Sequence, residues 1–237
     1  MDNKKIEARY DIWHDKLPVD LDIDTPWHNF VSGEMVKYDL TNKKILEIGC
    51  GRGGFAIFLS KLNKGTNEIF ACDFSHAAVE KGSSYAAKQG ITNITWTCAD
   101  IQNIPFDTNY FDVVISCETI EHVPNPLRAV HELARVLKPE GKLILTTPNY
   151  MNFLGLYRLY LRFTFRKWTE MGQPINNFTY VLKTLRWVRK AGLIMDNFSS
   201  VDFMIPWKPK NIRFNIRGRL SKFLGIQSFF VAHKPGT

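Results

Sequence analysis

The chain has 237 residues, 45% of them hydrophobic, which is enough to bury the core of one α/β domain but leaves no room for a second globular domain. Its first residues lack the apolar core of a signal peptide, and no run reaches the roughly 18 apolar residues that a membrane span needs. We therefore expect a cytoplasmic protein whose four cysteines, which have no zinc-ligand spacing, stay reduced as small hydrophobic side chains.

Helical and strand patterns alternate along the first two thirds of the chain. Two short helices, at 4–17 and 26–39, precede the first strand and carry Tyr10, Trp13 and Trp27, which either pack in the core or close over a ligand. Strands are expected at 44–48, 67–72, 92–97, 111–117 and 141–147, with helices at 54–63, 75–89 and 126–137, the last ended by Lys138-Pro139. This alternation predicts a doubly wound α/β fold with a mostly parallel sheet that binds ligands at the carboxyl ends of its strands.

The rest of the chain completes this sheet and adds to it. A helix at about 178–190, ended by Ala191-Gly192, and strands near 196–205 and 226–233 are expected to close the sheet. The segment between the fifth strand and the helix at about 178–190 is not needed by the core topology. This segment is therefore a candidate lid. We expect a single domain with these parts: an N-terminal helical cover at 1–40, a cofactor-binding core at 41–147, a helical lid insertion at 148–175 and a C-terminal completion of the sheet at 176–237.

Charge divides the chain unevenly. The net charge is +8, but 15 Lys and Arg against three acids follow residue 150, so this part carries a net charge of +12. Two segments, 151–168 and 208–223, combine basic residues with apolar residues at helical spacing. In the first these are Arg158, Arg162 and Arg166 with Leu154, Tyr157, Leu161, Phe165 and Trp168; in the second, six basic residues accompany Ile212, Ile216, Leu220 and Phe223. Such helices either lie on an anionic surface or bury their apolar stripe in their own protein.

A glycine turn after the first strand is the most informative stretch. In ILEIGCGRG, residues 45–53, an apolar strand breaks at Gly49 and Gly51, and Glu47 stands just before the turn. Together with Gly54, these glycines also fit the G-x-G-x-x-G motif of dinucleotide-binding folds, so a dinucleotide is an alternative ligand. The pyrophosphate of a dinucleotide would be repelled by Glu47. The ammonium and sulfonium of S-adenosylmethionine would be attracted to this carboxylate, so charge favours that cofactor.

Two further acids end the next two strands. Asp73 follows the second strand, where it is placed to accept both ribose hydroxyls of a nucleoside, and Asp100 follows the third, where it is placed to accept from an adenine amino group. Three acids at successive strand ends suit a cationic nucleoside. The alternative is that Glu47 and Asp100 only cap the helices that follow them.

Five segments carry a family resemblance, and they occur in one order between about residues 40 and 150: LEIGCGRG, CDFS, CADIQNIPF, FDVVISCETIEHV and LARVLKPEGKLILTTPN. They resemble the motifs of class I S-adenosylmethionine-dependent methyltransferases, and CETIEHVPNP is most similar to the branch with the ubiquinone-biosynthesis O-methyltransferases. The resemblance implies a seven-stranded Rossmann-like sheet and S-adenosyl-L-methionine as cofactor. It adds Gly53, Phe74, Ile101 and Cys117, which lie in or beside these motifs, to the predicted cofactor contacts.

The fourth strand is followed by the candidate catalytic residue. A hydroxyl nucleophile needs a base, and His122 stands at the rim with an imidazole whose ordinary pKa is near neutrality; the alternative is a structural cap on the turn after it. Glu118, Glu121 and His122 form E-x-x-E-H, a donor set that Mg²⁺, Mn²⁺ or Zn²⁺ would accept. The resemblance implies that a metal bound there would lower the pKa of a catechol-like hydroxyl.

The combined pattern predicts a methyltransferase that modifies a hydroxyl of a small or lipid-like acceptor, with the basic C-terminal half as substrate cover or as contact with an anionic membrane. Other acceptors are a small amine, which needs little base catalysis, and RNA, which the basic tail permits although no RNA-binding module is recognisable. A non-catalytic protein that binds S-adenosylmethionine, or a dehydrogenase, would keep the same glycine turn. Oligomeric state has no signature in the sequence.

Overall fold

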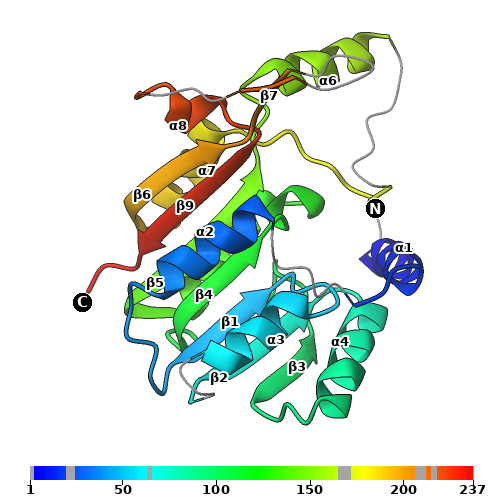
Figure 1. Ribbon diagram of the computed structural model, residues 1–237, viewed down its shortest axis with the longest axis vertical. Helices are drawn as coiled ribbons and strands as arrows, with labels where there is room; N and C mark the ends of the chain where they lie inside the picture. The colour runs from blue at the N-terminus through cyan, green and yellow to red at the C-terminus, as the bar shows by residue number, and fades with distance from the viewer. Residues whose placement is uncertain are drawn as a thin grey trace.

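A seven-stranded sheet forms the centre of the computed structural model, which describes residues 3–19, 25–62, 66–164, 172–205, 212–214 and 218–236 (Figure 1). The strand order is β3-β2-β1-β4-β5-β9-β6. These strands are β1 (Lys44–Ile48), β2 (Glu68–Asp73), β3 (Ile94–Cys98), β4 (Phe111–Cys117), β5 (Leu137–Pro148), β6 (Ile194–Val201) and β9 (Gln227–His233). β1 to β5 pair in parallel, and β9 lies antiparallel between β5 and β6. The predicted fold class is confirmed.

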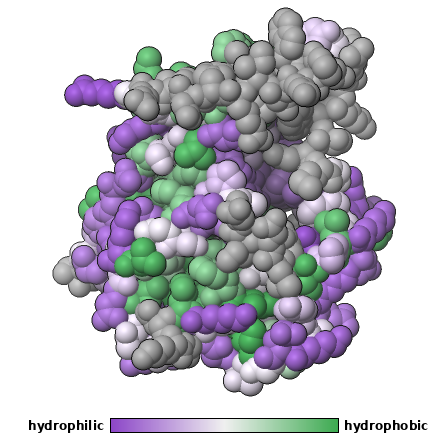
Figure 2. Space-filling model, in the orientation of Figure 1, coloured by the Kyte–Doolittle hydropathy of each residue, from purple (hydrophilic) through white to green (hydrophobic). Residues whose placement is uncertain are grey.

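Helices cover both faces of the sheet. α2 (Pro26–Met35) and α3 (Gly54–Lys61) lie in front of it in Figure 1 and share one hydrophobic cluster with it, whereas α5 (Pro126–Val136) and α7 (Val181–Lys190) belong to a second cluster. α4 (His76–Lys88) packs beside β2 and β3, and α1 (Asn3–Asp15) packs on α4. On the face that α2 and α3 cover, Figure 2 shows hydrophobic side chains between hydrophilic ones. None of the helices in the described part of the chain has the length and apolarity to cross a bilayer.

The alternation of side chains along each strand explains why both faces are covered. In β1, Ile45 belongs to the cluster with α2 and α3 and Leu46 to the cluster with α5 and α7; in β2, Ile69 and Phe70 divide in the same way. Successive side chains of a strand point to opposite faces, so a strand that is apolar at every position has to be buried on both. The apolar residues of the central strands therefore favour positions in the middle of the sheet, covered on both faces.

The C-terminal third differs from the prediction in two places. Asp202, with φ 58°, interrupts the strand expected at 196–205 and divides it into β6 and β7 (Phe203–Ile205). The prediction of a helix over 208–223 is wrong: residues 212–214 form β8 (Ile212–Phe214), which pairs with β7, and in the described part of this segment the helix is confined to α8 (Ser221–Leu224). Gly218, with φ 95°, adopts a conformation that a continuous helix does not contain.

The first basic segment does form a helix, α6 (Phe153–Phe163), at the top of Figure 1. Phe165, Arg166 and Trp168 lie outside the described residues. The helix buries Gly155 and Leu161, but its apolar surface extends well beyond the predicted stripe. Seven of the twelve exposed large hydrophobic side chains in the described residues lie in this segment: Met151, Phe153, Leu156, Tyr157, Leu159, Tyr160 and Phe163.

The indole of Trp96 on β3 packs over two glycines. A Cβ added at Gly53 would overlap the Trp96 ring, and one added at Gly82 of α4 would lie 2.5 Å from its Cζ3 atom. Gly53 also has φ 79°, in the left-handed region. This glycine therefore permits close packing between the glycine turn, β3 and α4.

We expect Gly53→Ala to lower the free energy of unfolding by about 2–4 kcal/mol, because it adds a clash with Trp96 to the cost of a left-handed non-glycine residue. Gly90→Ala is the matched control: Gly90 has φ 68° but no atom within 4 Å of an added Cβ, so the loss there should be about 1–2 kcal/mol. Urea denaturation monitored by circular dichroism measures both. Equal losses in the two variants would contradict the packing role of Gly53.

Candidate functional site

A cavity of about 230 Å³ opens at the carboxyl ends of β1, β2 and β4. Its walls come from the glycine turn, from the turns after β2, β3 and β4, and from α1 and α2. Of the predicted cofactor contacts, the following line it: Glu47, Gly49, Gly51, Asp73, Phe74, Asp100, Ile101 and Cys117. Gly53 does not line it, because that residue packs against Trp96 on the other side of the turn. The parallel strands thus bring together residues that are up to 70 positions apart in sequence, from Glu47 to Cys117.

The glycine turn is held by the backbone of β2. The amides of Gly49 and Cys50 donate to the carbonyl oxygen of Cys72, at 2.8 and 3.0 Å. Gly49 and Gly51 have φ values of 79° and 53°, which explains the residue type. A Cβ on Gly49 would overlap the Thr119 side chain, whereas a Cβ on Gly51 would project into the cavity, where the nearest other atom is His14 Cε1 at 3.7 Å. Gly51 therefore leaves room for a ligand beside the backbone.

Asp73 fixes the position of this turn relative to the next one. Its Oδ2 accepts from the Gly51 amide at 2.8 Å and its Oδ1 from the Ser75 amide at 2.9 Å. His14 Nε2 from α1 lies 4.0 Å from Oδ1. Burial lowers the pKa of His14, although the Asp73 charge acts in the opposite direction. The two amide hydrogen bonds thus fix the orientation of a carboxylate that lines the cavity, and each of its oxygens retains a lone pair for a ligand.

Glu47 is the least satisfied acid at the site. Its side chain is buried, with 4% of the residue exposed, and within the described residues its Oε2 has no hydrogen-bond partner. Burial and the charge of Asp73 raise the pKa of Glu47 to about 8. A buried carboxyl without a partner is costly, so a cationic or hydrogen-bond-donating ligand in the cavity would find a ready acceptor here.

The turns after β3 and β2 form another wall. Asp100 Oδ1 accepts from the Gln102 amide at 2.8 Å, and Gln102 Oε1 accepts from the Asn125 amide at 2.9 Å, so this rim is braced against α5. Phe74 meets Tyr10 of α1 edge to face, with ring centroids 6.5 Å apart. Ile101 is buried. Together these residues place apolar side chains beside polar groups, surroundings that suit a nucleobase.

His122 lies at the end of a short 3₁₀ turn, η2 (Ile120–His122), after β4. Its Nδ1 lies 2.7 Å from the carbonyl oxygen of Ile175. A carbonyl only accepts, so the proton of the neutral imidazole is on Nδ1 and the lone pair is on Nε2. Burial lowers the pKa of His122 to about 4, a correction to the expectation of a pKa near neutrality. The imidazole is therefore neutral at pH 7.

The predicted E-x-x-E-H metal ligands do not converge. Glu118 Oε1 accepts from the Thr146 hydroxyl at 2.8 Å, and Glu121 Oε2 accepts from the Thr147 hydroxyl at 3.1 Å. Thr146 and Thr147 are consecutive residues of β5 and point to opposite faces of the sheet, so the two carboxylates are held apart. Within the described part of the chain, Glu118, Glu121 and His122 do not form a group of three close donor atoms. Glu121 Oε1 lies 3.5 Å from His122 Nε2, so these two groups form a pair.

Helix α1 closes the cavity, which the sequence indicated only through its aromatic residues. Tyr10, Trp13 and His14 line the cavity, and the Tyr10 hydroxyl donates to the His122 carbonyl oxygen at 3.1 Å. Lys81 Nζ donates to the carbonyl oxygens of His14, Asp15 and Leu17 at the end of α1. A lysine at a helix C-terminus satisfies carbonyls that have no partner within the helix.

The other end of the contact between α1 and α4 is also polar. Asp11 Oδ1 accepts from the Ser75 hydroxyl at 2.6 Å and from the Ala77 amide at 3.2 Å, at the start of α4. Arg52 in the glycine turn donates to the Pro18 carbonyl oxygen. No spacing rule in the sequence connects Lys81, Asp11 or Arg52 with a site, because each acts over more than thirty residues on a partner in another element.

Comparison with known proteins extends these observations. Residues 46–145 match the family described as "Methyltransferase domain". The chain is 26% identical over 165 residues to a ubiquinone biosynthesis O-methyltransferase of Coxiella burnetii, with 69% of each chain covered. It is 26% identical to a ubiquinone/menaquinone biosynthesis C-methyltransferase of Blochmanniella pennsylvanica, with 84% of this chain and 80% of the relative covered.

Solved structures show the same fold. The [4+2]-cyclase SpnF superposes with a TM-score of 0.69 at 16% identity, over 99% of this chain and 97% of the other. An S-adenosylmethionine-dependent methyltransferase from Aquifex aeolicus gives a TM-score of 0.60 at 17% identity, over 98% of both chains. The methyltransferase-domain match over residues 46–145, the methyltransferase relatives and the order of the strands together support a class I S-adenosylmethionine-dependent methyltransferase.

Proposed function

We propose that this methyltransferase modifies a hydroxyl group of a lipid-like acceptor. His122 carries the proposal: it lines the cavity, and because its Nδ1 faces the Ile175 carbonyl, the neutral imidazole has its lone pair on Nε2. A hydroxyl nucleophile needs such a proton acceptor, whereas a neutral amine needs it less. The Coxiella relative named for O-methylation in ubiquinone biosynthesis supports the same class of acceptor.

In this proposal the cavity residues bind the cofactor as follows. S-adenosylmethionine, when bound, supplies an electrophilic methyl group on its sulfonium. Glu47 accepts a hydrogen bond from the cofactor's ammonium, either directly or through water, and Asp73 accepts from its ribose hydroxyls. Asp100 and Ile101 form the edge and floor of the adenine site, and Gly51 permits the close approach of the nucleoside.

In this proposal His122 accepts the proton of the acceptor hydroxyl, and Glu121 stabilises the charge that results. The cofactor would supply its methyl group to the acceptor oxygen and keep the bonding electron pair on its sulfur, and His122 Nε2 would accept the hydroxyl proton that the acceptor loses. The Glu121 carboxylate, 3.5 Å from that nitrogen, stabilises the imidazolium that results. With a pKa of about 4, His122 is a weak base, so proton transfer has to accompany methyl transfer and not precede it.

No step of this mechanism passes through a metal at E-x-x-E-H, because Thr146 and Thr147 hold the two glutamates toward opposite faces of β5. The Glu118 and Glu121 carboxylates would have to leave these hydroxyls before both reached one ion with His122. The residues as arranged do not fit that metal site.

The acceptor side is proposed to lie toward α6. The Arg158 guanidinium donates to the carbonyl oxygens of Asn176 and Asn177, next to the Ile175 carbonyl that holds His122. Arg158 therefore connects α6, with its exposed apolar surface, to the segment that holds His122. An exposed apolar surface of this kind, in a region with a net positive charge, suits peripheral contact with an anionic membrane that contains the acceptor.

An acceptor screen with methyl-labelled S-adenosylmethionine tests the proposed reaction. Phenols and catechols with and without an isoprenoid tail, primary amines and RNA are offered in parallel, and mass spectrometry locates the label. Label on the oxygen of a tailed phenol is the expected result. Label on a ring carbon, on nitrogen or on RNA alone would overturn the O-methylation proposal.

We expect S-adenosylhomocysteine binding at pH 7 to release close to one proton from Glu47. The free carboxyl, with a pKa of about 8, is mostly protonated at this pH, and the ligand's ammonium stabilises its ionised form. Titration calorimetry in buffers of different ionisation enthalpy measures the release. Glu47→Gln should abolish it and weaken binding about tenfold or more, the scale of a lost charge-assisted hydrogen bond. Identical proton release in the two proteins would contradict the proposed contact between Glu47 and the ammonium group of the ligand.

We expect His122→Asn to lower kcat by about 10²-fold or more while the affinity for S-adenosylhomocysteine survives, since general-base catalysis commonly contributes that much. The kcat profile of the wild-type enzyme should show no histidine ionisation near pH 6.5, because neutral His122 persists until the pH falls toward about 4. His131→Asn, at an exposed site on α5, is the matched control and should turn over normally. Wild-type turnover by His122→Asn would return this residue to a structural role.

We expect Leu156→Gln with Phe163→Gln to reduce binding to anionic vesicles. These side chains are 62% and 79% exposed on α6, and their burial in lipid is the apolar part of the proposed contact. Vesicle flotation with and without phosphatidylserine, at low and high salt, measures the effect. Val36→Gln, at a side chain that is 77% exposed beyond the end of α2, is the control and should float like the wild type. No flotation of the wild-type protein would eliminate the membrane contact.

A further inference from the structure

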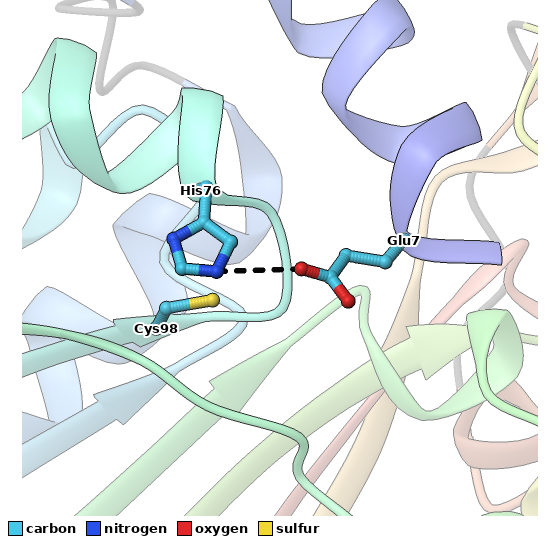
Figure 3. Close-up of side chains that lie close together, drawn as sticks. All are labelled: Glu7, His76 and Cys98. Atoms are coloured by element: carbon cyan, nitrogen blue, oxygen red, sulfur yellow. Dashed lines mark ion pairs between the residues drawn. The ribbon is translucent and has the colours of Figure 1, made fainter. Parts of the chain in front are cut away.

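Three metal-binding side chains converge beside the cavity but outside the proposed reaction. Glu7 comes from α1, His76 is the first residue of α4 and Cys98 is the last residue of β3 (Figure 3). One donor atom from each lies within 4.8 Å of the other two. His76 Nε2 and Glu7 Oε1 are 3.3 Å apart, and Figure 3 shows the imidazole, the thiol and the carboxylate turned toward one another.

The distances and donor types suit a small transition-metal ion. Two ligands bound at about 2.1 Å to a tetrahedral zinc ion lie roughly 3.4 Å apart, close to the separation of the nitrogen and the carboxylate oxygen. Thiolate, imidazole and carboxylate are all zinc ligands, whereas magnesium and calcium prefer oxygen ligands alone. The set gives three protein ligands and leaves a fourth position for water.

The surroundings also favour a cation. The acidic side chains of Glu7, Asp73 and Asp11 lie close enough to the Cys98 thiol to interact with it electrostatically. The thiol now lies 3.4 Å from the Phe74 carbonyl oxygen, a weak interaction that a metal bond would replace. The His76 side chain is 70% exposed, so an ion reaches the group from solvent without any rearrangement of the core. A dication here would compensate the negative charge and convert the thiol into a thiolate.

We propose that Glu7, His76 and Cys98 form a binding site for a divalent transition-metal ion, zinc in the first place, that joins α1 to α4 and β3. The ion would be structural for the α1 helix and separate from E-x-x-E-H. It would add a metal link to the contacts that Asp11 and Lys81 already make between α1 and α4.

The position of the site gives the ion a second effect, which rests on the proposed cofactor site. Tyr10, Trp13 and His14 lie on the same helix as Glu7 and line the cavity. A metal ion that holds α1 in place favours the closed cavity, and a ligand that fills the cavity favours α1 in the position that binds the metal. By linkage, metal and S-adenosylhomocysteine therefore strengthen each other's binding by the same factor.

Cobalt titration of the full chain, after chelator treatment, tests the metal site directly. Co²⁺ should produce the near-ultraviolet charge-transfer band of a cobalt–thiolate bond, saturate at one equivalent and be displaced by Zn²⁺. Cys98→Ser should abolish the band, and Glu7→Gln and His76→Gln should each weaken binding tenfold or more. Glu80→Gln and His131→Gln, at exposed positions elsewhere, and Cys72→Ala, in the core, are matched controls that should keep the band.

Absence of the band, or a band that survives Cys98→Ser, would overturn the site. Alkylation of the wild-type protein gives a second measurement that needs no variant: Zn²⁺ should slow the modification of Cys98 relative to the metal-free protein, and an unchanged rate would count against the proposal. S-adenosylhomocysteine affinity with and without Zn²⁺ separates this inference from the proposed function. A cobalt band without any change in this affinity would overturn the coupling alone, and a band in a protein that binds no S-adenosylhomocysteine would sink the cofactor assignment but not the metal site.

Discussion

The carboxylate of Asp73 is the constraint on which the rest of the site depends. One oxygen accepts from the Gly51 amide and the other from the Ser75 amide, so a single side chain sets the glycine turn, the end of β2 and the start of α4 relative to one another. A carboxylate has enough lone pairs to serve both amides and a ligand. Loss of this group would therefore disturb the shape of the cavity as well as any contact with a ribose, and its replacement cannot separate binding from structure.

The central sheet could be predicted because its strands are apolar on both faces. Runs such as ILEI and VVIS place apolar side chains on both faces of a strand, which favours burial between two layers of helices, and the helices around them have clear ends, for example Asn125-Pro126 at the start of α5 and Gly192 after α7. The cavity followed from topology, since parallel strands bring Glu47, Asp73 and Asp100 to the same edge.

The failures have a common physical origin in contacts that local sequence does not encode. Helical spacing suggested a helix over 208–223, but the pairing of β8 with β7 and the left-handed Gly218 override that periodicity. Gly53 was predicted as a cofactor contact because it lies in the glycine motif, but it packs against Trp96 and does not line the cavity. The E-x-x-E-H spacing brings three donors together in sequence, and two hydroxyls on consecutive residues of β5 separate them in space. The convergence of Glu7, His76 and Cys98 had no sequence signature, because it arises from three elements that are distant along the chain.

The attachment of α1 also bears on how fast the enzyme can work. In the proposed cofactor site a nucleoside would contact Tyr10, Trp13 and His14, and the helix that carries them is held by Asp11 at the start of α4 and by three hydrogen bonds from Lys81 to carbonyl oxygens. With the cofactor bound in this way, its exchange would require this helix to move away from the cavity. The residence time of the product therefore depends on the opening rate of α1, and a methyl-transfer step made faster by mutation would leave turnover unchanged wherever that opening is the slowest event.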